Sequence, residues 1–256
     1  MIGDTLKLDW GRSKIEFYYV PNFYLYLPPP CAKIYMDSLV LRRCRTIMAS
    51  EDRFEAGTAG GGQNMINDAM EFAAKAHEGQ FRKGTRRPYI VHPIEVADIV
   101  STMTKDEEVI CAAVLHDTIE DCRGITWDVL KLRFGSRVAD MVAQESEDKS
   151  KTWEERKGAT ISRLKDAPVE VQMIGLADKL SNMRDIDRDY PKEGDALWTR
   201  FRMQSKAALA WYYKGIRDVL EERFSGIPAF EEYCRLIDKN FGPGPAHTEW
   251  MKNERI

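Results

Sequence analysis

The chain has 256 residues, of which 43% are hydrophobic and 31% are charged, and its formal net charge is −3. This length allows one substantial core with an appendage, and the charge balance argues against a general nucleic-acid-binding protein, which is usually basic. The longest apolar stretch, residues 17–27, is interrupted by Pro21 and Asn22 and is too short to span a membrane. The N-terminus lacks a signal-peptide pattern, and the scattered cysteines suit a reducing compartment. We therefore expect a cytoplasmic protein that binds neither nucleic acid nor a membrane.

Residues 1–62 differ in composition from the rest of the chain. An aromatic run at 17–27 is followed by a triple proline and then by the sequence GTAGGG at 57–62, which is typical of a flexible linker. The aromatic run is compatible with a short strand pair, an interaction arm or a poorly ordered segment. We predict an N-terminal extension over 1–62, a folded domain over 63–225, and a C-terminal helix and tail over 226–256.

After this extension the apolar residues recur at helical spacing, and no alternating strand pattern appears. Asp106 is placed to cap a helix that runs through VICAAVLHDTIE, Thr126 to cap the next helix, and Gly135 to end it. Pro168 precedes a long helix through VEVQMIGLADKLSNMRDI, and residues 195–222 predict another helix. The pattern predicts an all-α bundle with functional groups on facing helices.

Four residues from three of these segments are suited to binding a metal. His116 and Asp117 are adjacent and offer one nitrogen and one oxygen ligand, while His92 opens another helix and Asp178 lies within a third. Two imidazoles and two carboxylates suit Mn²⁺, Fe²⁺ or Zn²⁺ better than Ca²⁺. Each residue alone has a commoner explanation, as a cap, a core histidine or a salt-bridged carboxylate. Their combination predicts a single-metal site between helices.

Polar residues at helical spacing accompany the predicted ligands. Glu120 and Asp121 each follow one residue of the His-Asp pair by four positions, and Asn182 follows Asp178 by four, so each shares a helix face with a ligand. A metal that activates water beside an acid/base group forms a hydrolytic site. The plain alternative for Glu120 and Asp121 is a solvated helix end.

The sequence RKGTRR, shortly before His92, is densely basic. It contains Arg82, Lys83, Arg86 and Arg87. Arginine clamps phosphate in bidentate fashion and stacks on nucleobases, although an ordinary solvated loop has the same composition. Beside a metal site, the loop favours a phosphorylated small molecule as substrate.

Three blocks of the chain, AHEGQFRKG…RPYIVHPIEVADIV, LHDTIED and GLADKLSNMRD, resemble the hydrolase domain of the RelA/SpoT alarmone enzymes. The resemblance covers about residues 63–222 and is nearest to the small alarmone hydrolases, which include the metazoan SpoT homologue. It implies an all-α HD-superfamily phosphohydrolase, usually with Mn²⁺, that removes the 3′-pyrophosphate of ppGpp or pppGpp to give GDP or GTP. Because only residues 223–256 follow the resemblance, we expect hydrolysis without alarmone synthesis.

The resemblance also implies roles for individual residues. The positions that match metal ligands are His92, His116, Asp117 and Asp178. The positions that match the acidic pair handling the attacking water are Glu120 and Asp121. The positions that match or adjoin substrate contacts are Arg82, Lys83 and Asn182.

Two departures from the family pattern concern the substrate. The loop between Lys83 and Pro88 is about one residue longer than in common bifunctional enzymes, and Asp185 stands where many relatives carry threonine, near the nucleotide. Two alternatives therefore stay open. One is an HD phosphohydrolase of ppApp, NADPH or another nucleotide, including an antitoxin against an alarmone-synthesising toxin. The other is a non-catalytic nucleotide-binding module. The sequence leaves open whether the chain forms a homo-oligomer.

Overall fold

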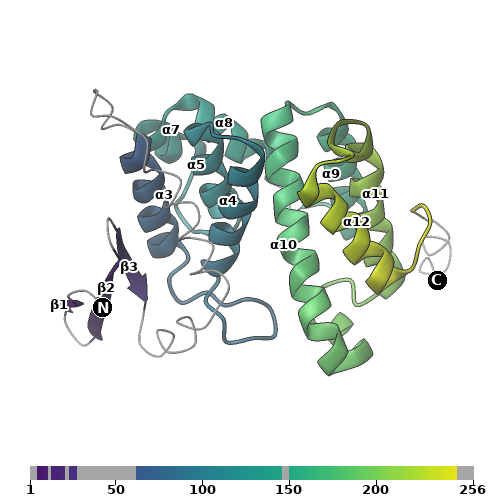
Figure 1. Cartoon of the computed structure of the whole chain (residues 1–256), viewed down its shortest axis with the longest axis horizontal. Helices are drawn as coiled ribbons and strands as arrows, with labels where there is room; N and C mark the ends of the chain where they lie inside the picture. The colour runs from purple at the N-terminus through teal and green to yellow at the C-terminus, as the bar shows by residue number, and fades with distance from the viewer. Residues whose placement is uncertain (1–4, 11–12, 21–22, 28–61, 146–149, 247–256) are drawn as a thin grey trace. The chain divides into compact units, whose positions relative to one another are not determined.

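The computed structural model describes residues 5–10, 13–20, 23–27, 62–145 and 150–246. The chain separates into two compact units, Met1–Thr58 and Ala59–Ile256. The first unit contains strands β1 (Thr5–Trp10), β2 (Ser13–Val20) and β3 (Phe23–Leu27), which form an antiparallel sheet in the order β1-β2-β3 (Figure 1). The aromatic run thus lies in β2 and β3, in line with the strand-pair interpretation. The predicted linker, apart from Gly62, and the predicted tail after residue 246 lie outside the described residues.

The second unit is helical, apart from an isolated bridge between Phe81 and Pro88, over its described residues. This confirms the all-α prediction for the part of the chain after the extension. In chain order the elements are α3 (Gly62–Ala76), α4 (Val91–Met103), α5 (Glu107–Leu115), α6 (Thr118–Asp121), α7 (Trp127–Phe134), α8 (Ser136–Glu145), α9 (Trp153–Asp166), α10 (Val169–Glu193), the 3₁₀ helix η1 (Gly194–Arg200), α11 (Lys206–Phe224) and α12 (Pro228–Phe241). In the described ranges, no helix combines the length and apolarity that a membrane crossing needs.

Helix α10 runs through the middle of this unit (Figure 1). It packs against α4, α5 and α8 on one side and against α9, α11 and α12 on the other. Its buried residues extend from Val171 to Asp189, because a helix between two groups of helices must bury more than one face. A polar side chain on α10 is therefore within reach of groups from both sides.

Local capping residues define several helix starts where the sequence predicts them. The Asp106 carboxylate accepts a hydrogen bond from the Glu108 amide at 3.1 Å, which satisfies an amide at the start of α5. Thr126 caps α7, and Gly135 ends it with a φ of 90°, a conformation that favours glycine. These signals act between residues that are neighbours in sequence, so the sequence alone reveals them.

The structure corrects one predicted helix at the His-Asp pair. Helix α5 ends at Leu115, the pair forms a turn, and the short α6 follows. The His116 Nδ1 atom bonds to the carbonyl of Ala113 at 2.9 Å, and the Thr118 hydroxyl donates to the carbonyl of Leu115 at 2.7 Å. Side chains thus satisfy carbonyl groups at the helix end, which allows the chain to turn there.

The single helix predicted over 195–222 is also wrong. The structure places η1 and α11 in this stretch, separated by residues 201–205. The Ser205 side chain accepts a hydrogen bond from the Ala208 amide at 3.2 Å and so starts a new helix. Gln204, just before this cap, has a φ of 53°, which is incompatible with a continuous right-handed helix.

Candidate active site

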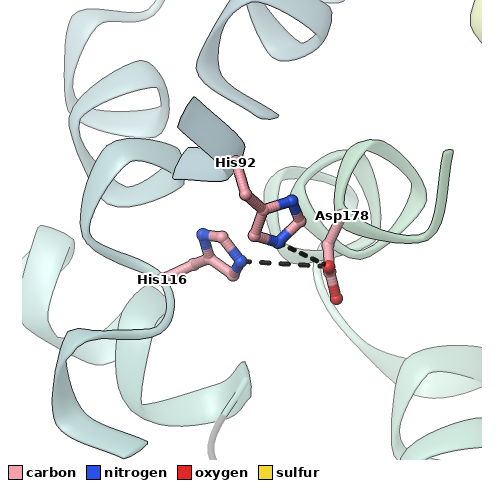
Figure 2. A group of neighbouring side chains, drawn as sticks. All are labelled: His92, His116 and Asp178. Atoms are coloured by element: carbon pink, nitrogen blue, oxygen red, sulfur yellow. Dashed lines mark ion pairs between the residues drawn. The ribbon is translucent and has the colours of Figure 1, made fainter. Parts of the chain in front are cut away.

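Two histidines and an aspartate from different elements meet inside the helical unit (Figure 2). His92 is the second residue of α4, His116 directly follows α5, and Asp178 lies in α10. One possible ligand atom from each residue lies within 4.8 Å of the other two. Both histidine side chains are 2% exposed, so the cluster is shielded from bulk water. The described residues thus contain a candidate site for a divalent metal.

The carboxylates of Asp178 and Asp117 both face the two imidazoles. The Asp178 Oδ1 atom lies 3.1 Å from His92 Nε2 and 3.9 Å from His116 Nε2. The Asp117 Oδ2 atom lies 3.1 Å from His116 Nε2 and 3.6 Å from His92 Nε2. The Tyr89 hydroxyl donates to the same Asp117 oxygen at 2.6 Å, which orients this carboxylate. Three of the four predicted ligands, His92, His116 and Asp178, thus form the candidate group, and the Asp117 carboxylate lies beside it.

The donor set fits a cation. His116 Nδ1 donates to the carbonyl of Ala113, so in the neutral imidazole Nε2 carries the lone pair that a metal requires. This Nε2 is buried and faces the Asp117 Oδ2 atom at 3.1 Å. A bare lone pair would be repelled by the facing carboxylate oxygens, so this position calls for a positive charge, either a proton on Nε2 or a metal ion. Two imidazole nitrogens with two carboxylates are ligands that Mn²⁺, Fe²⁺ and Zn²⁺ accept.

The electrostatics of the cluster also favour an added positive charge. Burial disfavours a charged imidazole, but the carboxylates of Asp117 and Asp178 outweigh it and raise the pKa of His116 to about 9. Burial likewise disfavours the Asp117 and Asp178 carboxylates. Even so, His116 and His92 hold the pKa of Asp117 below its usual range, and Lys179 and His92 do the same for Asp178. The site therefore attracts a cation, either a proton or a metal ion.

The Asp178 carboxylate has two further partners on its own helix. Asn182 donates to Oδ1 at 2.6 Å, as its predicted place on the same face allows, and the Lys179 ammonium contacts Oδ2. Asn182 also accepts a hydrogen bond from Arg82 at 2.7 Å. The sequence offered no specific reason to select Lys179. The predicted substrate contacts Arg82 and Asn182 are thus linked directly to a predicted ligand.

A second charged cluster centres on Asp185. Its carboxylate accepts hydrogen bonds from Arg82 and Arg87 at 2.9 Å and from Arg188 at 2.6 Å. The Arg82 guanidinium also lies 5.6 Å from the ring centroid of Tyr89. Two of the four basic residues of the loop, Arg82 and Arg87, thus form ion pairs with Asp185.

The remaining predicted site residues lie nearer the surface. Lys83 is exposed, Glu120 on α6 is half-buried, and Asp121 at the end of α6 is exposed. Burial and the neighbouring Asp117 carboxylate raise the pKa of Tyr89. Tyr89 itself was missed, because a tyrosine before a predicted ligand is no signal by itself.

The helical bundle with a candidate metal site formed by buried His92, His116 and Asp178 is the arrangement of an HD domain. The model of the HD-domain family matches residues 69–204. The chain belongs to this family, and its relatives place it in the group of the metazoan SpoT homologues.

Two curated relatives are named "Guanosine-3′,5′-bis(diphosphate) 3′-pyrophosphohydrolase MESH1". The Homo sapiens protein is 39% identical over 140 residues, which span 54% of this chain and 75% of the relative. The Mus musculus protein is 35% identical over 172 residues, which span 64% and 92%. A solved structure described as "A metazoan ortholog of SpoT hydrolyzes ppGpp and plays a role in starvation responses" superposes with a TM-score of 0.61 at 25% identity. It covers 74% of this chain and 100% of that one.

Proposed function

We propose that this chain is a metal-dependent phosphohydrolase that removes the 3′-pyrophosphate of ppGpp and pppGpp and leaves GDP or GTP. The observation that carries the proposal is the buried group of His92, His116 and Asp178, with Asp117 beside it, in a chain whose relatives bear the name of this activity. We assign the activity to residues 63–225, with 1–62 as an extension.

We further propose Mn²⁺ as the metal, held by His92, His116, Asp117 and Asp178. A bound divalent cation lowers the pKa of water and polarises a phosphate oxygen. The mixed set of imidazoles and carboxylates, without a thiolate, supports Mn²⁺ over a structural zinc.

Glu120 and Asp121 are proposed to orient the attacking water and accept its proton. The water oxygen bonds to the phosphorus attached to the ribose 3′-oxygen, the bond between that phosphorus and the 3′-oxygen breaks, and a proton restores the 3′-hydroxyl. The position of both residues on α6, directly after the ligand pair, supports this role. Carboxylates that accept a proton in the transition state typically contribute about 10²–10⁴-fold to the rate.

Arg82, Lys83 and Asn182 are proposed to hold the nucleotide. Arg82 is anchored by Asp185 and Asn182, so its planar guanidinium is already oriented for stacking on a base or for binding a phosphate. Lys83 is exposed beside it and supplies a mobile positive charge. An orientation fixed before binding reduces the entropy lost when substrate binds.

The test is pyrophosphate release by the purified full chain with Mn²⁺ and ppGpp, alongside ppApp and NADPH as competing substrates. We expect pyrophosphate release from ppGpp. We also expect Asp117→Ala and Asp178→Asn to lower kcat by at least about 100-fold, because loss of a direct metal ligand should cost more than the about 10–100-fold caused by loss of a residue that only supports a ligand. Asp140→Asn, on α8 and bonded to Trp127, is a matched control that should retain activity. Cleavage of ppApp or NADPH without cleavage of ppGpp contradicts the substrate, and full activity of Asp117→Ala contradicts the metal site.

A further inference from the structure

A chain of hydrogen bonds leaves the metal cluster on the side of His92 that faces away from the carboxylates. His92 Nδ1 lies 2.9 Å from the hydroxyl oxygen of Ser181, which is 1% exposed. The Ser181 hydroxyl donates to Glu95 Oε2 at 2.8 Å. The predicted ligand thus contacts a buried serine on α10, and that serine is bonded back to a glutamate on α4.

The chain continues to the C-terminal helix. Arg184 donates to Glu95 Oε1 at 3.0 Å, and its Nε and Nη2 atoms donate to the two oxygens of Glu232 at 2.7 Å each. These side chains are 21–29% exposed, so bulk water screens their pairing only in part. Glu232 lies on α12, outside the residues that match the HD-domain family.

The direction of these hydrogen bonds decides which nitrogen of His92 is available to a metal. Ser181 has one hydroxyl hydrogen and gives it to Glu95, so the His92–Ser181 contact requires the hydrogen to be on Nδ1. The Nε2 atom then keeps its lone pair and faces Asp178 at 3.1 Å. If Glu95 accepted nothing, the Ser181 hydroxyl could donate to Nδ1 instead. The hydrogen would then move to Nε2 and block coordination.

Arg184 decides which way the Glu95 carboxylate faces. By holding Oε1, it leaves Oε2 for Ser181, and Glu232 holds the guanidinium by both of its oxygens. Burial opposes the charge on Arg184, but the two glutamates outweigh it and raise the pKa of the guanidinium. A bidentate pair of this kind fixes geometry as well as charge.

We propose that Ser181, Glu95, Arg184 and Glu232 are positioning residues through which α12 holds His92 in its metal-binding tautomer and strengthens binding of the divalent cation. The inference rests on the metal site of the proposed function. Partners in the second layer around a metal ligand typically contribute about 10- to 100-fold to metal affinity.

The test is the dissociation constant of Mn²⁺ for the metal-free full chain, measured by titration calorimetry. We expect Ser181→Ala and the isosteric Glu95→Gln to weaken Mn²⁺ binding by about 10- to 100-fold, and Glu232→Gln by a smaller factor. Glu95→Gln is the sharpest variant, because its amide can donate to Ser181 and reverse the hydrogen bond to His92. The ¹⁵N chemical shifts of the His92 ring should then move from the Nδ1–H to the Nε2–H pattern in the metal-free protein.

Asp187→Asn is the matched control. Asp187 on α10 bonds to Lys239 at 2.7 Å and to Asn240 at 3.0 Å, so this variant also weakens the contact between α10 and α12. It leaves the hydrogen bonds among the four positioning residues unchanged. It should leave the Mn²⁺ affinity within about 2-fold of the original, well below the effect of an outer-layer partner.

Three outcomes overturn the inference. Wild-type Mn²⁺ affinity in Ser181→Ala and Glu95→Gln would show that the tautomer is set without them. An equal loss in Asp187→Asn and Glu232→Gln would show a general effect of helix packing. Absence of Mn²⁺ binding by the unmodified chain would overturn the metal site itself, and with it the proposed function. If Mn²⁺ binds the unmodified chain and the variants equally well, only the role of the positioning residues is contradicted, and the proposed function stands.

Discussion

At the residue scale, Asp185 determines how much of the positive charge of the basic loop is already paired within the protein. One carboxylate pairs with Arg82, Arg87 and Arg188, and these guanidiniums hold the pKa of Asp185 at about 2, although burial alone would raise it. The residue therefore neutralises part of the positive charge beside the predicted substrate contacts and fixes Arg82 in place. The contribution of these ion pairs to the free energy of unfolding can be measured by substituting Asp185.

We predict that Asp185→Asn lowers the free energy of unfolding at neutral pH by about 2 kcal/mol, which corresponds to a depression from the usual aspartate pKa to about 2. Because the folded-state pKa is depressed, the stabilisation is present above the unfolded pKa near 4 and is lost as the pH falls toward 2. The difference between the two proteins should therefore shrink between pH 5 and pH 3. Urea unfolding at several pH values measures it, and a difference that stays constant over this range would contradict the ion-pair origin.

At the element scale, α9 begins with a complete capping box. The Thr152 hydroxyl accepts from the Glu155 amide at 3.2 Å, and the Glu155 carboxylate accepts from the Thr152 amide at 2.9 Å. Each interaction satisfies an amide that the helix leaves unpaired at its start. Helix α9 packs against α11 and α10, so its first turn is stabilised both locally and by packing.

We predict that Thr152→Ala destabilises the protein by about 1 kcal/mol through loss of this cap, which lowers Tm by about 2–4 °C in a protein of this size. Thermal unfolding followed by circular dichroism gives the measurement. Thr152→Ser keeps the hydroxyl and serves as the control, with Tm close to that of the unmodified chain. Equal losses in both variants would mean that the methyl group matters more than the cap.

Helix α10 shows how one element serves two purposes. Asp178 and Asn182 face the metal cluster and the basic loop. Ser181 and Arg184 form hydrogen bonds to residues of α4 and α12. Because side chains on a helix return to one face every three or four residues, alternate faces of the same turns carry different tasks. The helix lies between two helical groups, and both faces are therefore occupied.

At the scale of the whole molecule, the cluster joins α4, the turn after α5, and α10, so a bound cation would link elements that are far apart in sequence. A ligand that binds only the folded state stabilises it by about 2.7 kcal/mol at 100 times its Kd.

We therefore predict that Mn²⁺ at about 100 times its Kd raises Tm by about 5–10 °C over the EDTA-treated protein. Differential scanning calorimetry of the full chain measures the shift. Asp178→Asn should show little or no shift at the same concentration. A Tm that does not respond to Mn²⁺ in the unmodified chain would contradict a metal site in the folded core.

The sequence by itself determined the helical character of the second unit and several of its boundaries. Asp106, Thr126 and Gly135 act on amides or carbonyls within a few residues, and such local effects are encoded in adjacent positions. The metal-binding residue types were also visible, because few side chains other than histidine and aspartate suit a mixed nitrogen and oxygen site.

Only the tertiary structure decided the partners of those residues. Arg82 meets Asp185 across 103 positions, and His92 meets Ser181 across 89. Helical spacing relates residues on one helix but contains no information about which face of another helix will be opposite. That choice depends on the packing of α10 between α4 and α12, where burial of apolar surface, summed over the whole unit, sets the positions of the polar groups.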